Sequence, residues 1–403
     1  MIFQTLDDKS SCVGIYAGEN LYFDEKQFPT ELTSTWSPSS YLRDRDVEYA
    51  SLYLEGANIF DLLPEYLKDD WGDINDKLKS FQRSLSIAKI DMNQNCFYDL
   101  VPNRFLIEYC EIKNKITSYI LQKMDKPKRY EFYKSLALMI EDISNRKVNI
   151  DRKKVKSLLG TSKWSNHAKR LLECSPYIDY NQFGTKTGRL TTKNNTFPIL
   201  TLPSSFKSFI VPSNDVFVEL DFNGAEVRVL LGLGGHKQPD LDVHTYHAEK
   251  FLGDRKLRER AKIDFFSWLY GSKDKNIQKL ANCFEQDYNK ELILNKFYQD
   301  RTVRTIYNKV IEDVSEHHAL NYIIQSTSAE LTLKQALKMD FLLRDRKVSS
   351  FVFGVVHDSV ILDMKKEDVC LLPSLKYLMS STEFGSFKIN IKAGRNLLEM
   401  KQI

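Results

Sequence analysis

Four side chains with different chemistry recur at every fourth position of one stretch, namely Arg258, Lys262, Phe266 and Tyr270. Four residues advance an α-helix by about 400°, so these side chains share one face and span about 18 Å. The two cations can neutralise phosphates, and the two rings can stack on a sugar and a base. The spacing therefore predicts a helix that binds a nucleoside triphosphate. The alternative is an amphipathic surface helix with scattered charges.

Two isolated carboxylates flank this stretch. Asp221 ends an alternating apolar and polar run that is typical of a half-buried strand, and a turn leads from it into a helix that contains Glu226. Asp358 follows His357 between two apolar runs, the pattern of a β-hairpin with a polar tip. A single Asp at a strand end is usually a cap or turn residue. Three signals in this order favour a site instead.

Such a set of residues suits phosphoryl transfer. Two carboxylates can hold a pair of divalent ions about 3.5 to 4 Å apart, and Mg²⁺ fits because it shares its shell with water and substrate phosphates. Mn²⁺ can substitute. Lys262 and Arg258 would neutralise charge on the transferred and leaving phosphates. We therefore expect Asp221, Asp358 and Lys262 to be catalytic, without a covalent protein intermediate.

The same segments resemble motifs A, B and C of family A (Pol I-like) DNA polymerases, in the order of that family. A fourth segment resembles its TGRLSS element and a fifth its N-x3-Q element, so the resemblance covers about 180 to 365. The matching segments are 221–228, 258–271, 356–358, 187–192, and Asn321 with Gln325. The resemblance implies an α+β right-hand polymerase fold with an antiparallel palm sheet, helical fingers, a reduced thumb and an N-terminal exonuclease-like α/β remnant.

The resemblance also assigns roles to individual residues. It implies Asp221 and Asp358 as metal ligands, and Glu226 as a steric gate against a ribose 2′-hydroxyl. Its implied contacts to the incoming dNTP are Arg258, Lys262, Phe266, Glu226, His244 and Tyr270, of which Tyr270 would also lie beside the templating base. Its implied contacts to primer-template DNA are Arg189, Asn321, Gln325 and His357.

The expected domains follow from the same comparison. They are a degenerate 3′–5′ exonuclease-like or partner-docking domain (1–125), a reduced thumb and basic linker (126–180), palm with motif A (181–249), fingers (250–320) and palm with motif C (321–403). Lys113 stands where the third exonuclease motif has Asp, and lysine cannot bind a cation. We therefore expect no proofreading. A short thumb implies low processivity unless a replisome partner clamps the DNA.

The chain departs from the family pattern at Gly224, His317 and Ser359, where the family usually has Gln, Arg and an acidic residue. Single-subunit RNA polymerases favour serine after His-Asp, so an enzyme of that kind is the main alternative. Phe266 and Glu226 favour DNA synthesis. RNA polymerases of this kind have Met at the position of Phe266 and no carboxylate at the position of Glu226. A non-catalytic DNA-binding relative is the third interpretation, and the retained carboxylates and cations argue against it.

The formal net charge is +4, but the first 100 residues are acidic and residues 103–170 are strongly basic. Lys153 and Lys154 are candidates for DNA-backbone contacts, with a solvated helical face as the alternative. Six scattered cysteines without a C-x2-C pair indicate free thiols, no zinc site and a reducing compartment, hence the cytoplasm, or the host cytoplasm for a viral or plasmid enzyme. We expect no membrane partner, because no apolar run approaches 18 residues.

Overall fold

The computed structural model describes residues 1–403 except 8–12, 162 and 273. The chain forms two compact units, and each unit is assembled from three separate segments. The first unit consists of Met1–Val148, Thr161–Gly184 and Thr192–Pro198, and the second of Asn149–Gly160, Thr185–Thr191 and Ile199–Ile403. The segments of the two units therefore alternate along the sequence.

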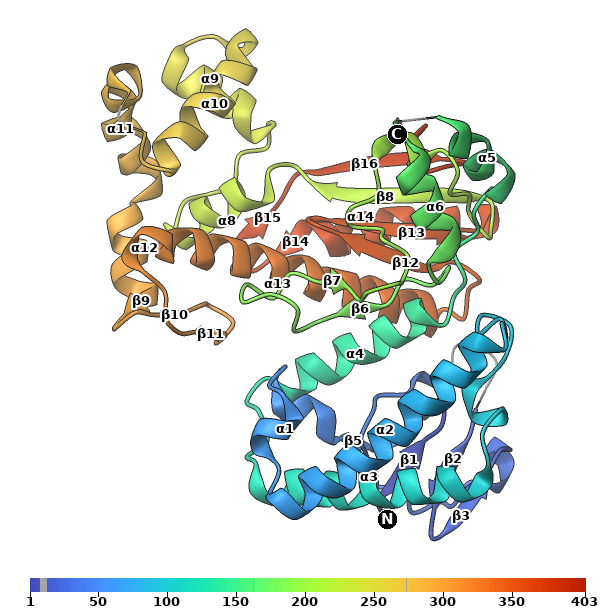
Figure 1. The fold of residues 1–403 in the computed structure, drawn as a ribbon. Helices are drawn as coiled ribbons and strands as arrows, with labels where there is room; N and C mark the ends of the chain where they lie inside the picture. Colours follow the sequence, from blue (N-terminus) through green and yellow to red (C-terminus); the bar gives the residue numbers. More distant parts are fainter. Residues whose placement is uncertain (8–12, 162, 273) are drawn as a thin grey trace. The chain divides into compact units, whose positions relative to one another are not determined.

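The first unit combines a small antiparallel sheet, of order β1-β2-β3, with long helices (Figure 1). Its strands are β1 (Phe3–Thr5), β2 (Ile15–Ala17), β3 (Asn20–Tyr22), the parallel pair β4 (Ser34–Thr35) and β5 (Glu48–Tyr49), and β6 (Tyr180–Asn181). Its helices are α1 (Ile59–Leu62), α2 (Glu65–Ile87), α3 (Asn103–Lys123), α4 (Tyr130–Ser144) and α6 (Ser165–Glu173). The short strand β7 (Thr191–Thr192) crosses the boundary between the units. Phe3, Ile15 and Leu106 are fully buried in the core that joins this sheet to α3.

A half-buried carboxylate on α4 gives this unit a pH-dependent stability. Burial raises the pKa of Glu141 to about 7, and repulsion from Asp7 acts in the same direction. The hydrogen bond from Asn145 lowers the pKa and so opposes both effects. The folded pKa lies above the unfolded one, so the ionised carboxylate destabilises the fold at pH 8, and the penalty disappears as the pH falls towards 4.5. We expect Glu141→Gln to stabilise the protein by about 1 to 2 kcal/mol at pH 8, after allowance for solvent screening.

Urea unfolding of both proteins at pH 8 and pH 4.5 measures this difference. The gain should vanish at the lower pH, where the wild-type carboxyl is already neutral. An equal gain at both pH values would mean that hydrogen bonding, and not charge, sets the effect.

The cysteines correct one expectation from the sequence. Cys110, Cys174, Cys283 and Cys370 form no disulfide, but Cys96 is disulfide-bonded, so the expectation that every cysteine is a thiol is wrong. The expected thiol at position 12 lies outside the described residues. A disulfide requires two Cα atoms about 4.4 to 6.8 Å apart with their Cβ atoms facing each other, and sequence spacing reports neither.

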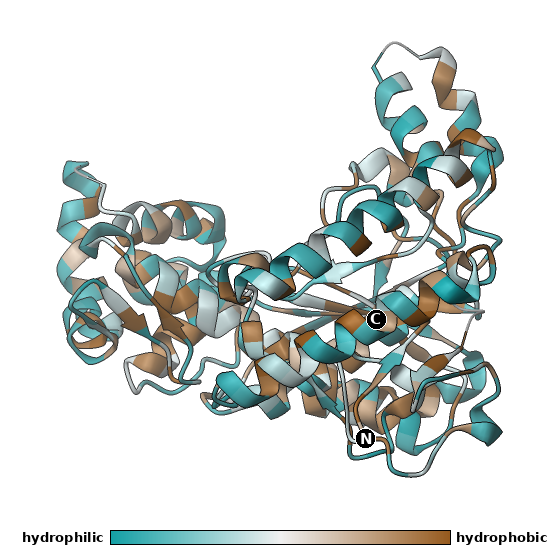
Figure 2. Cartoon of the chain, turned by 60° about the horizontal axis from the view of Figure 1, so that its bottom comes forward, coloured by the Kyte–Doolittle hydropathy of each residue, from teal (hydrophilic) through white to brown (hydrophobic). Residues whose placement is uncertain are grey.

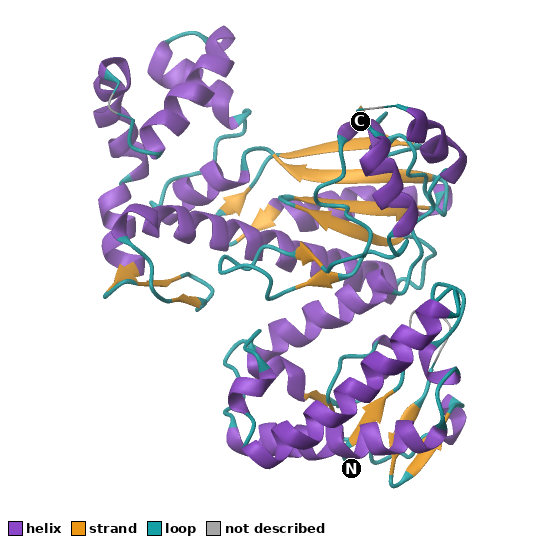
Figure 3. Ribbon diagram, in the orientation of Figure 1, coloured by secondary structure: helices purple, strands orange, loops and turns teal. Residues whose placement is uncertain are grey.

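The second unit is built on a five-stranded antiparallel sheet of order β12-β13-β8-β16-β17, with helices packed against it (Figure 3). These strands are β8 (Val216–Phe222), β12 (Phe351–Val356), β13 (Ser359–Met364), β16 (Ile389–Gly394) and β17 (Lys401–Gln402). The other strands form two small sheets, β9 (Tyr298–Gln299) with β10 (Thr302–Arg304) and β11 (Val310–Ile311), and β14 (Ser381–Thr382) with β15 (Gly385–Ser386). The sheet is antiparallel, as the resemblance implied.

The helices of this unit are α5 (Arg152–Ser157), α7 (Ser204–Lys207), α8 (Ala225–Leu233), α9 (Val243–Leu252), α10 (Arg258–Leu269), α11 (Lys275–Tyr288), α12 (Lys290–Phe297), α13 (Glu316–Asp345) and α14 (Leu372–Ser380). Strand β13 is buried along its whole length, whereas β8 alternates between buried and partly exposed residues, as its sequence predicts. The apolar residues of the strands and of the helix faces that meet them appear brown in Figure 2. Helix α13 packs on β12 and contacts both α8 and α14, so it is buried on several sides.

Helices α9, α10 and α11 project from the sheet as a separate group (Figure 1). An aromatic core joins them, in which Phe265 and Trp268 of α10 pack against Phe284 and Tyr288 of α11. His247 of α9 lies in the same core and bonds the Tyr288 hydroxyl. Because these residues occupy the buried face of α10, its opposite face is left to Lys262, Phe266 and Tyr270.

Candidate active site

The two isolated carboxylates lie at neighbouring strand ends of the five-stranded sheet. Asp221 lies near the end of β8, and Asp358 lies in the two-residue tip between β12 and β13. Strand β13 pairs with β8 so that Ser359 stands opposite Asp221, and the amide of Phe222 donates to the Asp358 carbonyl at 3.5 Å. The predicted strand end and hairpin are therefore confirmed, and the pairing brings the two side chains together.

Both carboxylates are held in surroundings that disfavour two negative charges. Burial raises the pKa of Asp221 to about 6, and repulsion from Glu219 and Asp358 adds to it. Burial also raises the pKa of Asp358, against the favourable charges of Arg189 and His357. Neutral donors give each carboxylate only weak support, from the Asn390 amide at 3.4 Å and the Ser328 hydroxyl at 3.5 Å. A bound cation would relieve this repulsion.

The donor set fits a hard divalent cation that is shared with a substrate. Mg²⁺ prefers oxygen ligands and usually takes one or two carboxylates, with water and phosphate oxygens completing its shell. The described residues contain no group of three or more His, Cys, Asp or Glu side chains suited to enclose a metal ion. Asp221 and Asp358 thus offer two oxygen-bearing groups and leave coordination positions for a phosphate.

The hairpin tip carries backbone strain. His357 has a φ of 54°, in the left-handed region that costs a non-glycine residue about 1 kcal/mol or more. A two-residue turn between right-twisted strands requires a positive φ at this position. The imidazole is exposed, whereas the neighbouring Asp358 is half-buried. The turn therefore directs two adjacent side chains into different surroundings.

Glu226 lies in the first turn of α8 and is held by an arginine from another segment. Arg189 Nη2 contacts Glu226 Oε1 at 2.6 Å, and burial raises the pKa of the carboxyl despite this partner. The preceding Gly224 has a φ of 69°, and a Cβ there would lie 2.6 Å from Val243 Cγ1. Glycine at this departure from the family pattern is therefore required by the local backbone and by its contact with α9.

A cavity of about 190 Å³ lies beside Glu226. Tyr270 and Asn321 line it together with His317, and its remaining walls are Leu269, Gly271, His318, Leu320 and Ile324. Burial raises the pKa of Tyr270, and the charge of Glu226 acts in the same direction. The predicted sequence elements around Glu226, Tyr270 and Asn321 thus converge on one space.

The four-residue ladder is confirmed as one face of α10, with Tyr270 as its C-terminal cap. The rings of Phe266 and Tyr270 stack at 6.2 Å, and Lys262 lines the same open groove. His244 lies 5.8 Å from the Phe266 ring, and burial lowers its pKa to about 4. His244 is therefore neutral at pH 7, so it can take part in hydrogen bonds but adds no charge. In the described chain, no hydrogen bond or ion pair joins Arg258 or Lys262 to Asp221 or Asp358.

The remaining sequence-predicted contacts fall in three places. Arg189 and His357 line a small cavity of about 20 Å³ next to α13. Asn321 and Gln325 lie one turn apart on α13. Lys153 and Lys154 are exposed on α5, where Lys154 pairs with Asp151 at 3.2 Å, so they do not belong to the cluster around the carboxylates.

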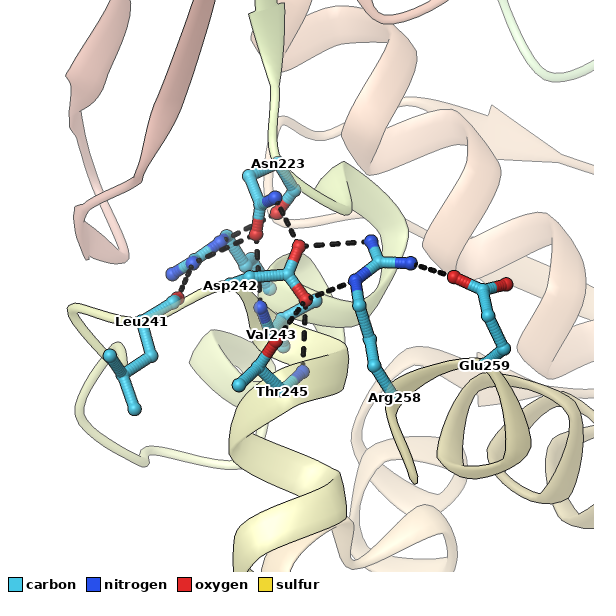
Figure 4. A network of polar contacts seen from close by, with 8 residues as sticks. Asn223, Leu241, Asp242, Val243, Thr245, Arg258 and Glu259 are labelled. Atoms are coloured by element: carbon cyan, nitrogen blue, oxygen red, sulfur yellow. Dashed lines mark hydrogen bonds and ion pairs between the residues drawn. The ribbon is translucent and has the colours of Figure 1, made fainter. Parts of the chain in front are cut away.

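Several residues near the carboxylates are absent from the sequence prediction. Asn390 stands opposite Asp221 on β16, and Lys392 stands opposite Glu219 and contacts it at 3.4 Å. Asp242 binds Arg258 through both carboxylate oxygens (Figure 4). The alternation of Ile389 and Ile391 with Asn390 and Lys392 signals a strand, but not its neighbour.

The chain is similar to known polymerases in part of its sequence and in its fold. No protein-family model matches the chain. DNA polymerase I of Chloroflexus aurantiacus is 30% identical over 112 residues, which is 24% of this chain and 12% of that relative's length. The POL domain of Pol1 from M. smegmatis, solved in complex with DNA primer-template and dNTP, matches 98% of this chain and 95% of its own with a TM-score of 0.64 at 12% identity.

This chain has a polymerase-domain fold. The partial sequence match is to a DNA polymerase I, and the structural match shows the fold. The match to the relative covers a small part of its length, whereas the structural match covers nearly the whole chain. Within the described residues no helix is long and apolar enough to cross a membrane.

Proposed function

We propose that this chain is a DNA-directed DNA polymerase that adds dNTPs to the 3′ end of a primer. The observation that carries the proposal is the pairing of β8 with β13, which brings Asp221 and Asp358 to neighbouring strand ends. The charge of Asp358 acts on Glu226, and Glu226 shares a cavity with Tyr270, the last residue of the α10 ladder. The fold of the M. smegmatis Pol1 domain, whose complex holds primer-template and dNTP, supports the same proposal.

In this proposal Asp221 and Asp358 hold the divalent ions. The chemistry that a bound pair of Mg²⁺ ions supplies, with Mn²⁺ as a substitute, is activation of the primer hydroxyl and stabilisation of the leaving oxygen. Lys262 and Arg258 bind the phosphates and neutralise their charge. Glu226 excludes a 2′-hydroxyl, and Tyr270 lies beside the templating base.

The proposed DNA contacts are Arg189, Asn321, Gln325 and His357 near the primer terminus, with Lys153 and Lys154 on the duplex backbone. Gly224, His317 and Ser359 replace the larger or charged residues that the family usually has there. Ser359 instead donates to the Val356 carbonyl at 3.0 Å within the hairpin. We expect weaker checking of the primer terminus and an unaffected chemical step.

The first unit is proposed to lack proofreading. Lys113 lies on α3, where its ammonium group stands 5.2 Å from the Tyr109 ring, and the Asp7 carboxylate accepts a hydrogen bond from Ser39. A nuclease metal pair requires clustered carboxylates, and within the described residues no group of three or more His, Cys, Asp or Glu side chains could hold a metal ion. A mismatched 3′ end should therefore persist. Brisk excision that is lost in Asp7→Ala would overturn this part of the proposal.

The short segment between α4 and β6 supports low processivity. We expect the isolated protein to release primer-template after few additions, unless a clamping partner raises the local concentration of DNA. Primer extension in the presence of a DNA trap measures the product length in one binding event. Long products from the isolated protein would contradict a reduced thumb.

Incorporation of a single labelled nucleotide on a primed template tests the main proposal. With Mg²⁺ we expect dNTP addition directed by the template, and little rNTP addition. Preference for rNTP would favour the alternative of a single-subunit RNA polymerase-like enzyme, which Ser359 alone supports. Binding of primer-template without addition of either nucleotide would favour a non-catalytic DNA-binding relative.

The ring at position 266 provides a further prediction. Phe266 has no hydroxyl, so it cannot replace a contact that the substrate loses with its 3′-hydroxyl. We expect Phe266→Tyr to increase incorporation of a dideoxynucleotide relative to dNTP by about 10- to 100-fold, the effect of one well-placed hydrogen bond. Competition between the two nucleotides on one template measures the ratio, and Phe266→Leu should not increase it.

A further inference from the structure

Arg258 is already bound in this structure, although it is the first cation of the proposed triphosphate ladder (Figure 4). Its Nε donates to Asp242 Oδ1 at 2.9 Å and its Nη2 donates to Asp242 Oδ2 at 3.0 Å. We infer that Asp242 is a positioning residue that holds the Arg258 guanidinium in the orientation in which it binds a nucleotide phosphate. This inference rests on the proposed function.

The geometry of the pair leaves Arg258 able to bind a second anion. A guanidinium has five N–H donors in a rigid planar fork. Two of them go to Asp242, and one on Nη1 goes to Glu259. The donors that remain lie in the plane that Asp242 fixes. A phosphate would therefore bind a guanidinium whose orientation Asp242 has already fixed.

Asp242 is itself fixed by partners from three directions. Its Oδ1 caps α9 by accepting from the backbone N–H of Thr245 at 2.9 Å. Its Oδ2 accepts from the side-chain amide of Asn223 at 2.6 Å. Burial would raise the pKa of Asp242, but Arg258, Asn223 and Thr245 together hold it well below its usual range. The carboxylate therefore stays ionised at any working pH.

The hydrogen bonds around Asp242 continue to the end of β8 that carries Asp221, a proposed metal ligand. Asn223 follows Asp221 by two residues, and its Oδ1 accepts from the Val243 amide at 3.0 Å. Arg228 is fully buried and donates to the carbonyls of Asn223, Pro239 and Leu241, at 2.7, 2.9 and 2.8 Å. A continuous set of hydrogen bonds thus links the end of β8 to the first residue of α10.

Loss of this restraint should act on binding more than on chemistry. The Arg258 side chain is 39% exposed, so without Asp242 it would regain most of its rotamers. A nucleotide would then have to order it. The expected result is a higher KM for dNTP with little change in kcat.

Asp242→Asn is the variant that separates orientation from folding. Asparagine caps helix N-termini as well as aspartate does, so α9 should remain intact. Its amide can accept from only one of the two Arg258 donors. The matched control is Asp274→Asn, which changes the cap of α11 in the same group of helices, where the Asp274 side chain accepts from the Asn276 amide.

A double-mutant cycle with Arg258→Gln tests whether Asp242 acts through Arg258. Single-nucleotide incorporation should show KM for dNTP raised about 10-fold in Asp242→Asn, with kcat within about threefold of wild type. In the Arg258→Gln background, Asp242→Asn should add less than about twofold, and Asp274→Asn should match wild type. Multiplying effects in the double variant, or an unchanged KM in Asp242→Asn, would overturn the inference.

Equilibrium binding of dATP in the presence of Mg²⁺, measured on the same proteins, keeps this result apart from the proposed function. A wild-type protein that binds dATP but incorporates none refutes the polymerase proposal, and the cycle is then read in Kd with the same expected coupling. If wild type incorporates nucleotide but the cycle shows no coupling, only the role of Asp242 is refuted.

Discussion

Asp358→Asn should lose at least about 1,000-fold of the primer-extension rate while primer-template binding stays close to wild type. The substitution removes one of two carboxylates that the sheet places side by side, so the proposed site can no longer hold a pair of divalent ions. Asparagine keeps the shape of the side chain. Because the structure disfavours the ionised form of Asp358, the neutral variant should fold at least as stably.

Rapid-quench extension of a labelled primer measures the rate, and a gel-shift titration measures DNA binding. Asp345→Asn is a suitable control, because Asp345 is an exposed carboxylate at the last residue of α13. Near-wild-type extension by Asp358→Asn would remove the main support for the proposed chemistry. Loss of DNA binding in parallel would instead indicate a structural role for the hairpin.

Glu226→Ala should raise the efficiency of rNTP incorporation relative to dNTP by about 10- to 100-fold. Arg189 fixes the Glu226 side chain at 2.6 Å in the first turn of α8, so a substrate cannot easily push it aside. Truncation to alanine opens space next to the cavity that Tyr270 and Asn321 line. Discrimination by fit in a pocket of this kind contributes about 1 to 3 kcal/mol, which gives the expected range.

Glu226→Gln distinguishes size from charge in this discrimination. Glutamine fills nearly the same volume, so steric exclusion predicts that it rejects rNTPs almost as well as the wild type does. Measurement of kcat/KM for both nucleotide classes in the three proteins decides the question. If Gln and Ala admit rNTPs equally, the exclusion depends on the charge of Glu226 and not on its bulk.

The local elements of the site could be predicted from the sequence because each has a short-range signature. The ladder from Arg258 to Tyr270 has a helical period, and β8 alternates as a half-buried strand does. The hairpin around Asp358 follows from two apolar runs with a polar dipeptide between them. These signals also carried the resemblance on which the roles of Glu226 and Tyr270 depend.

The partners of these residues could not be predicted, because they depend on contacts between distant segments. Asn390 on β16 is 169 positions further along the chain than Asp221, and only the pairing of β16 with β8 places the two opposite each other. The sequence around Asp242 is typical of a helix N-cap, and in the structure Asp242 caps α9. The same side chain also binds Arg258, which the sequence does not indicate. Nothing in the spacing of Asp242 and Arg258 indicates which of the nearby acids the arginine selects.

The first unit was the least predictable part of the chain. Its strands are two or three residues long, too short for a clear alternation, and the pairing of β1 with β2 brackets residues that the structure does not describe. The interleaved segments of the two units also have no compositional boundary. The disulfide at Cys96 shows the same limit, since it is a fact of tertiary proximity.

The position of β8 within its sheet has a mechanical consequence. Hydrogen-bonded neighbours, β13 and β16, flank it on both sides, so the main chain that carries Asp221 is an interior strand. Amide protons of β8 should accordingly be among the slowest to exchange with deuterium, and those of α9 to α11 among the faster ones. In a catalytic cycle, the strand that carries Asp221 would then stay fixed while α9 to α11 open and close.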